Sequence, residues 1–275
     1  MLDGLTRILD EASLLVTYNG RSFDVPVMDT RWAFHRRESP TEALPHFDML
    51  SVARRLWGGQ QESCSLSALE RSILRFHRLG DVPGLEIPSR YFQFLRTGDT
   101  TLIDGVLDHN RYDIVSLAAI TGHALRLAAE GPEACECASE LAGLGLFYER
   151  SGDLERSEQA YALAGASEDP DVAVQALSRL GVLLRRANRF EEAARAWQAV
   201  LAVADGRADM QVWSQRAAEA LAIHHEHRAR DLAAARQYAE TLRTASTGRA
   251  AASVDHRIGR LERKIKKRTD GALNL

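Results

Sequence analysis

Apolar and polar residues follow two different patterns along the chain. The continuous apolar run at residues 14–17 is typical of a buried strand, and it leads directly into Asn19 and Asp24. Farther along, Val106 and Ile114 belong to a set of apolar residues that recur at helical spacing. The N-terminal part therefore combines a predicted strand with predicted helices.

The C-terminal part carries a repeat with a period of 36 residues. The repeated positions are Leu141, Leu144, Gly145 and Tyr148, then Leu177, Leu180, Gly181 and Leu184, then Trp213, Arg216, Ala217 and Ala220. The second helix of each unit repeats as well, with Tyr161 matched by Trp197. A small residue at the third position of each set lets two helices approach closely, so the pattern predicts stacked helix pairs. An apolar face along residues 253–268 predicts a final capping helix.

These patterns predict two domains of different class. Gly131-Pro132 ends the preceding helical pattern, because proline cannot continue a helix. We therefore expect an α/β domain over residues 1–130 and an all-α domain over residues 131–275.

The amino-acid composition limits the classes of protein to which this chain can belong. With 45% hydrophobic and 27% charged residues, the chain of 275 residues has the ordinary composition of a soluble protein. No apolar stretch approaches the ~18 residues of a membrane span, and residues 1–20 show no signal-peptide pattern, so we expect a cytoplasmic protein without membrane association. The three cysteines fit no zinc or disulfide framework. A formal charge of −3 limits nucleic-acid binding to local basic patches.

Two short motifs contain the candidate functional residues. The predicted strand delivers Asn19 and Asp24 to the C-terminal edge of a sheet, which is where α/β folds place ligands. His109 and Asp113 are four residues apart on a predicted helix and therefore share one face. We expect these two carboxylates and the histidine to converge on one site.

The two motifs resemble those of a known nuclease family. Residues 18–26 and 109–113 are similar to the second and third exonuclease motifs of the DEDD superfamily, the ribonuclease-H-like 3′–5′ exonucleases. Residues 45–50, 82–84 and 87–92 further resemble the YprB-type branch, in which tetratricopeptide repeats follow the exonuclease domain. The resemblance covers about residues 5 to 125. It implies a ribonuclease-H-like sheet domain followed by a helical solenoid of tetratricopeptide type.

The resemblance also implies an activity and roles for particular residues. The family hydrolyses phosphodiester bonds at single-stranded DNA or RNA 3′ ends with two divalent ions, for which Mg²⁺ or Mn²⁺ is expected. Asp24 and Asp113 would be metal ligands, and His109 would orient and deprotonate the attacking water. The substrate contacts would be Tyr18, Asn19, Phe23 and Asn110.

The family's first motif, an Asp-x-Glu on the opening strand, is not found in this chain. It belongs some dozens of residues before Asn19, and only 18 residues precede Asn19 here. Asp10 and Glu11 lie in an amphipathic helical stretch and do not replace it. We therefore expect an N-terminally truncated domain that lacks its first three strands, either because the start codon is placed too late or because the gene is a remnant. Such a chain should show no exonuclease turnover.

Each candidate residue also has an ordinary structural interpretation. Asn19 and Asp24 are typical caps for a helix that begins near Pro26. His109 taken alone is typical of a surface histidine. Asp48 is either a further acidic neighbour of the site or a cap for the helix that follows it.

Three features of the C-terminal part lie outside the nuclease motifs. We interpret the histidine-rich residues 224–227 as a polar loop between helices, with metal ligation as the alternative. The basic residues of the capping helix favour either a nucleic-acid or partner contact or a solvated helix end. Arg185, Arg186 and Arg189 are predicted to form an exposed basic patch for an acidic partner segment.

Two functions of different class follow. The first is a metal-dependent 3′–5′ exonuclease whose repeats recruit a partner protein. The second is a catalytically inactive protein whose helical repeats act as an interaction module.

Overall fold

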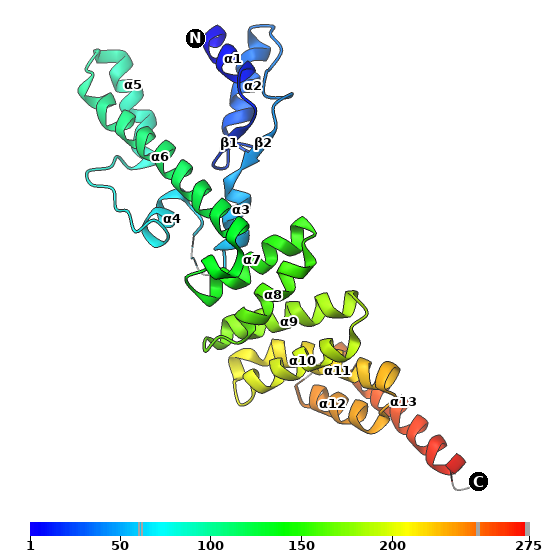
Figure 1. The fold of residues 1–275 in the computed structure, drawn as a ribbon. Coiled ribbons are helices and arrows are strands. Elements are labelled where there is room, and N and C mark those ends of the chain that lie inside the picture. Colours follow the sequence, from blue (N-terminus) through cyan, green and yellow to red (C-terminus); the bar gives the residue numbers. More distant parts are fainter. Residues whose placement is uncertain (60, 62, 246–247, 273–275) are drawn as a thin grey trace. The chain divides into compact units, whose positions relative to one another are not determined.

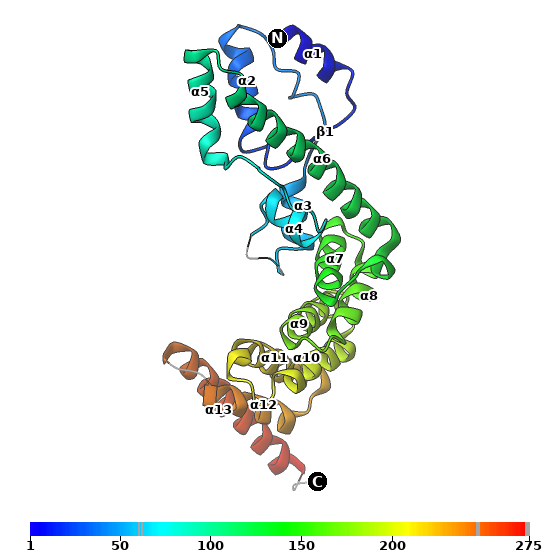
Figure 2. The ribbon, with the colours of Figure 1, turned by 90° about the vertical axis from the view of Figure 1, so that its left-hand side faces the viewer.

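The chain divides into two compact units, Met1–Ala134 and Cys135–Leu275. The computed structural model describes residues 1–59, 61, 63–245 and 248–272. Both units are mainly helical, and the sequence-coloured ribbon can be followed from element to element in two views (Figures 1 and 2).

The first unit begins with helices that alternate with two strands. The order is α1 (Leu2–Asp10), β1 (Leu15–Thr17), α2 (Asp24–Phe34), β2 (His46–Asp48) and α3 (Met49–Leu56). The strands pair in parallel, with Leu15 opposite His46 and Thr17 opposite Asp48. Parallel strands need a crossover between them, and α2 lies within that connection. The two strands form the whole sheet found in the described residues, which is much smaller than the sheet of an ordinary α/β domain.

A long helix organises the rest of the first unit. The elements are α4 (Leu66–Ser72), η1 (Gly84–Glu86), α5 (Ile87–Thr97), α6 (Thr101–Glu130) and η2 (Gly131–Ala134). Helix α6 contacts α3, α4 and α5. Trp57, Leu69 and Ile120 are fully buried in this unit. Gly131, with φ of 84° and ψ of −155°, ends α6 in a positive-φ conformation that glycine adopts without steric penalty.

The second unit consists of successive packed helices. They are α7 (Ala138–Ser151), α8 (Leu154–Gly165), α9 (Pro170–Arg186), α10 (Phe190–Ala204), η3 (Ala208–Met210), α11 (Gln211–His224), η4 (His225–Ala229), α12 (Leu232–Ala245) and α13 (Gly248–Ala272). Each long helix contacts the next one along the chain. Asp153 and Asp169 start α8 and α9 by accepting hydrogen bonds from backbone N–H groups of the first turn.

Close approach between helices depends on the predicted small residues. A Cβ atom added at Gly145 would lie 2.6 Å from the Tyr161 ring, and one added at Gly181 would lie 2.4 Å from Nε1 of Trp197. Both distances are far shorter than a van der Waals contact, so only glycine permits these helices to pack as they do. The spacing of the two contacts reproduces the 36-residue period of the sequence.

The interpretation of residues 224–227 as a polar loop is wrong. Helix α11 continues to His224, and a single π-helical turn, η4, follows it. The Glu226 side chain is completely buried and accepts hydrogen bonds from Arg260 at 2.8 Å and from Lys264 at 2.7 Å. A buried carboxylate needs such partners, so this segment is a packed junction between η4 and α13.

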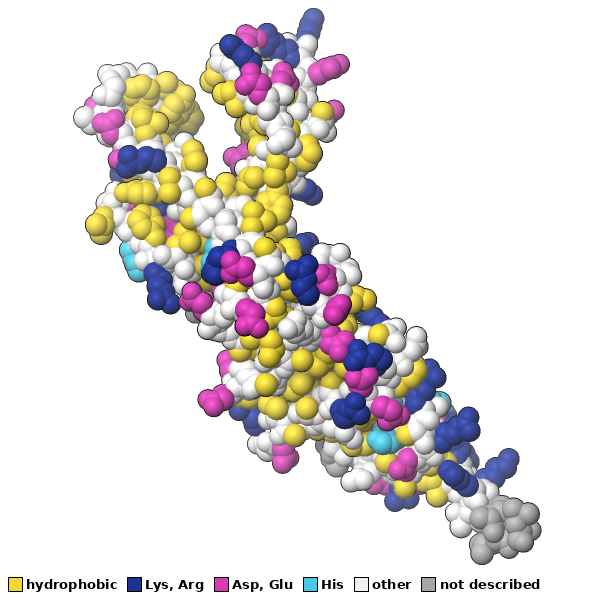
Figure 3. Space-filling view, viewed as in Figure 1, with side chains coloured by type: hydrophobic (Ala, Val, Ile, Leu, Met, Phe, Trp, Pro, Cys, Tyr) yellow, Lys and Arg dark blue, Asp and Glu magenta, His cyan; other side chains and the backbone are white. Residues whose placement is uncertain are grey.

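Helix α13 is the predicted basic capping helix, and Lys and Arg side chains gather over it (Figure 3). Arg260 and Lys264 are engaged by Glu226, while Arg257 lies 3.8 Å from Glu219. Arg263 and Lys266 are exposed. Some of the basic residues of this helix therefore form ion pairs with acidic side chains of the same unit.

The predicted basic patch at residues 185–189 is also corrected. Arg189 donates to Glu158 and to Glu192, both at 2.5 Å, and these carboxylates neutralise it. Arg186 lies 3.3 Å from Glu149. Arg185 instead lies over the ring of Trp197, with its guanidinium carbon 5.9 Å from the ring centroid. The three arginines do not form one free surface.

Candidate functional site

Five charged or titratable side chains meet where α4, α6 and the loop between α4 and η1 come together. Glu70 lies on α4, Arg78 and Asp81 lie in the loop, and His109 and Asp113 lie on α6. The predicted residues His109 and Asp113 are thus brought together, as their four-residue spacing on one helix requires. We call these five side chains the Arg78 cluster.

Arg78 is the centre of the cluster. Its Nε donates to Oε2 of Glu70 at 2.7 Å, and its Nη2 donates to Oδ1 of Asp113 at 2.6 Å. Its Nη1 donates to Oδ2 of Asp81 at 3.1 Å. A planar guanidinium presents its donors in a fixed fork, so one arginine can hold three carboxylates in a defined arrangement.

Burial makes the Arg78–Glu70 pair important for the fold. The side chains of Arg78 and Glu70 are only 7% and 2% exposed. Charges removed from water in this way persist only when they are paired and hydrogen-bonded. Burial by itself lowers the pKa of Arg78, but the hydrogen bonds to Glu70 and Asp113 outweigh burial and raise it. The guanidinium is therefore permanently charged.

His109 is anchored by Asp81. Its Nδ1 lies 2.7 Å from Oδ1 of Asp81. Burial raises the pKa of Asp81, but hydrogen bonds from His109 and Arg78 outweigh burial and lower it, so this carboxylate is ionised and only accepts. Nδ1 must then carry a proton, and Nε2 is the ring nitrogen that this hydrogen bond does not use. Nε2 lies 3.6 Å from Oδ2 of Asp113.

Asp24 is not part of this cluster. It occupies the first turn of α2, its side chain is exposed, and no hydrogen bond or ion pair within the described residues joins it to His109 or Asp113. Its interpretation as a helix cap is also wrong, because the N-cap of α2 is Phe23 and no side chain accepts a capping hydrogen bond there.

Asp48 stabilises the loop that contains Asn19. Its Oδ1 accepts from the backbone N–H of Asn19 at 2.8 Å, and its Oδ2 accepts from that of Arg21 at 3.1 Å. It also caps α3 by accepting from the N–H of Leu50 at 3.1 Å, so the capping interpretation is confirmed for Asp48. Asn19 has a positive φ of 62°, a conformation that asparagine tolerates better than most residues. Asn19 therefore holds a tight turn directly after β1.

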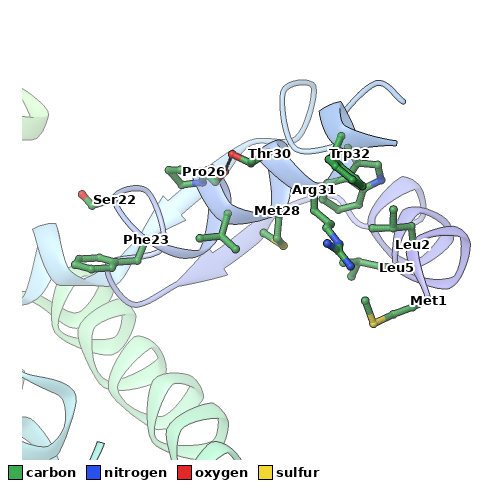
Figure 4. A pocket seen from close by; sticks show the side chains of 12 residues that line it. Met1, Leu2, Leu5, Ser22, Phe23, Pro26, Met28, Thr30, Arg31 and Trp32 are labelled. Atoms are coloured by element: carbon green, nitrogen blue, oxygen red, sulfur yellow. Dashed lines mark hydrogen bonds between the residues drawn. The ribbon is translucent and has the colours of Figure 1, made fainter. Parts of the chain in front are cut away.

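The other predicted substrate contacts are dispersed. The hydroxyl of Tyr18 donates to the backbone carbonyl of Cys64, and burial raises the pKa of this half-buried tyrosine. Phe23 lines an apolar pocket of about 770 Å³ together with residues of α1 and α2, among them Leu5 and Met28 (Figure 4). Asn110 is exposed on α6. The structure does not gather these side chains around His109 and Asp113.

The described residues do not fit the paired-metal site that the resemblance implies. They contain no group of three or more His, Cys, Asp or Glu side chains placed to hold a metal ion. One oxygen of Asp113 already faces the Arg78 cation at 2.6 Å. A divalent ion bound there would experience strong repulsion from that guanidinium at short range.

The sequence patterns did not predict three members of the cluster, namely Glu70, Arg78 and Asp81. Asp81 directly precedes the Val82-Pro83-Gly84 motif, and this position beside a motif was the one sequence signal that pointed to any of the three. Arg78 is 35 residues from Asp113 and lies in a loop, where periodicity carries no information.

Comparisons with known proteins agree with the N-terminal motifs. Residues 1–125 match a family model described as RNase_H superfamily. The chain is also 33% identical over 231 residues to the uncharacterized protein YprB of Bacillus subtilis (strain 168). That alignment covers 82% of this chain and 54% of YprB, so the chain spans about half the length of the curated relative it matches. No solved structure matches the chain. Among the described helices, none is both long and apolar enough to cross a membrane.

Proposed function

We propose that this chain derives from metal-dependent 3′–5′ exonucleases and does not itself hydrolyse nucleic acid, and the match of residues 1–125 to the RNase_H superfamily supports the derivation. Members of the superfamily generally use divalent metals. The substrate class of the proposal is single-stranded DNA or RNA with a free 3′ end. The observation that carries the loss of hydrolysis is the ion pair between Arg78 and Asp113.

The inherited residues of this proposal are those of the two motifs. Asp24, His109 and Asp113 are the proposed catalytic residues, and Tyr18, Asn19, Phe23 and Asn110 are the proposed substrate contacts. His109, with Nδ1 bound to Asp81, is in the tautomer that a general base requires. Asp24 and Asp113 are the proposed ligands for Mg²⁺ or Mn²⁺ in an active relative.

Arg78 opposes metal binding in this chain. An ion at Asp113 would require the guanidinium to leave, and the same guanidinium also neutralises buried Glu70. Leaving a buried carboxylate without its partner costs about 3–5 kcal/mol. The described residues contain no group of three or more His, Cys, Asp or Glu side chains placed to hold an ion in return, so this energy is not recovered.

The test is digestion of 3′-labelled single-stranded DNA and RNA by the purified 275-residue chain with Mn²⁺ or Mg²⁺. We expect no shortening of either strand, and the same result for the Asp113→Ala variant. Digestion by the unmodified chain that disappears in Asp113→Ala would overturn the proposal.

We propose in addition that residues 131–275 are tetratricopeptide-type repeats that recruit a partner protein. The support is the repeated close contact of Gly145 with Tyr161 and of Gly181 with Trp197, at the period of the sequence repeat. Stacked helix pairs of this kind bury a continuous core and expose extended surfaces for binding. A fragment of residues 135–275 that lacked a cooperative helical melt by circular dichroism would contradict the assignment.

A further inference from the structure

A groove of about 360 Å³ lies on the second unit. It is formed by α7, α9, α10 and α11, and α9 contacts the other three helices. The charged and aromatic side chains that line it are Glu149, Arg179, Arg185, Arg186, Trp197, Trp213 and Arg216. Four arginines therefore face one carboxylate.

Glu149 leaves most of this positive charge uncompensated. The carboxylate accepts from the hydroxyl of Tyr161 at 2.9 Å and lies 3.5 Å from Arg179 and 3.3 Å from Arg186. It is 19% exposed and is already shared by these three donors. The groove thus has a formal excess of three positive charges, four arginines less one glutamate.

Of the four arginines that line the groove, Arg185 and Arg216 have no carboxylate partner within the described residues. Each lies against an indole instead, Arg185 at 5.9 Å from the Trp197 centroid and Arg216 at 5.5 Å from the Trp213 centroid. Contact with an aromatic ring orients a guanidinium and leaves its N–H edge free for a planar acceptor. Both cations are therefore oriented toward an acceptor that the described residues do not supply.

We propose that this groove binds an acidic peptide segment of a partner protein. Carboxylates of the segment contact Arg185 and Arg216, and its apolar side chains pack near Val182 and Ala220, which also line the groove. The inference depends on the proposed interaction role of residues 131–275 and not on hydrolysis by residues 1–125.

The observations favour a peptide over a single strand of nucleic acid. Proteins bind single strands by stacking bases on free aromatic faces along a basic track. Trp197 is only 5% exposed, and Arg185 and Arg216 lie over the two indoles. Trp197 therefore offers no free face to a base, and one face of the half-buried Trp213 is covered by Arg216.

The test measures binding of a fluorescein-labelled peptide of alternating Glu and Leu to the full chain by fluorescence anisotropy. The comparison peptide has Gln in place of every Glu, and labelled oligo-dT is the nucleic-acid probe. We expect the Glu peptide to bind about tenfold more tightly than the Gln peptide, since each desolvated carboxylate–arginine pair contributes on this scale. The Arg185→Gln/Arg216→Gln variant should lose this preference.

Arg195→Gln is the matched control, because Arg195 is 69% exposed on α10 and does not line the groove. It should bind the Glu peptide like the unmodified chain. The circular dichroism melt of each variant shows whether its fold is retained, and Arg185→Lys/Arg216→Lys, which keeps both charges, should retain part of the preference. Equal binding of both peptides would overturn the groove as an acidic-peptide site, whereas the absence of a cooperative helical melt in residues 135–275 would overturn the repeat assignment on which the inference depends. Equal loss in Arg195→Gln, or tighter binding of oligo-dT than of the Glu peptide, would overturn the groove as the acidic-peptide site.

Discussion

Nη2 of Arg78 lies 2.6 Å from Oδ1 of Asp113 and joins the loop after α4 to the middle of α6. The same nitrogen also donates to the buried carboxylate of Glu70 at 2.5 Å. One guanidinium therefore connects the core of the first unit with the residue that the motif comparison predicts as a metal ligand. The stability of the fold and the proposed loss of hydrolysis therefore depend on the same guanidinium.

Removal of Arg78 should destabilise the chain strongly. Arg78→Ala leaves Glu70 buried without its partner, and we expect a loss of about 3–5 kcal/mol in the free energy of unfolding. Urea unfolding followed by circular dichroism and tryptophan fluorescence measures this loss. Arg90→Ala is the control, because Arg90 forms an exposed ion pair with Glu86 and should change stability by less than about 1 kcal/mol.

A double replacement separates charge from packing at this position. Glu70→Met/Arg78→Met removes both ions and keeps much of their volume, so it should recover most of the stability lost in Arg78→Ala. A double variant as unstable as the single one would show that the ion pair itself, rather than the unpaired carboxylate, determines the loss.

Sequence patterns were informative where neighbouring residues face each other. The four-residue spacing of His109 and Asp113 predicted that they meet, and the recurrence of Gly145 and Gly181 predicted close helix contacts. The catalytic role of His109 and Asp113 stays a prediction. The interpretation of Glu226 as part of a polar loop failed because its partners Arg260 and Lys264 lie 34 and 38 residues farther along the chain. A local sequence pattern carries no signal for such pairs. For the same reason it did not predict the contact of Arg78 with Asp113, which lies 35 residues farther along the chain.

The second unit should be sensitive to a single methyl group at Gly181. A Cβ atom there would lie 2.4 Å from Nε1 of Trp197, so Gly181→Ala must displace the indole or separate α9 from α10. We expect a loss of about 1–3 kcal/mol, measured by thermal unfolding. Gly259→Ala on α13 is the control, because its nearest neighbour is the flexible end of Arg263 at 3.7 Å. That substitution should stabilise the helix by about 0.5–1 kcal/mol, and equal losses in the two variants would contradict the packing account.

Glu226 should make stability depend on pH in the acid range. Burial raises the pKa of this carboxyl, but hydrogen bonds from Arg260 and Lys264 outweigh burial and lower it from 4.5 to about 2. A depressed folded-state pKa gives stability that is complete above pH 4.5 and is lost as the pH falls toward 2. The shift corresponds to about 3 kcal/mol.

Chemical denaturation at pH values between 2 and 7 tests this dependence. Glu226→Gln should be less stable than the unmodified chain near neutral pH, and the difference should shrink toward pH 2. Glu219→Gln serves as the control, since Glu219 is exposed and lies 3.8 Å from Arg257. A constant difference between Glu226→Gln and the unmodified chain at every pH would exclude titration of Glu226 as its cause.

The central claim is that Arg78, and not a metal ion, neutralises Asp113 in this chain. Titration of the purified chain with Mn²⁺, followed by the electron paramagnetic resonance signal of free Mn²⁺, tests it most directly. We predict no binding tighter than about 1 mM, and identical titration curves for the unmodified chain, Asp113→Ala and Asp24→Ala, because the part of the chain that the structure describes places no set of carboxylates to replace the ion's hydration shell. Binding of one or two ions with micromolar affinity that disappears in Asp113→Ala would contradict the account.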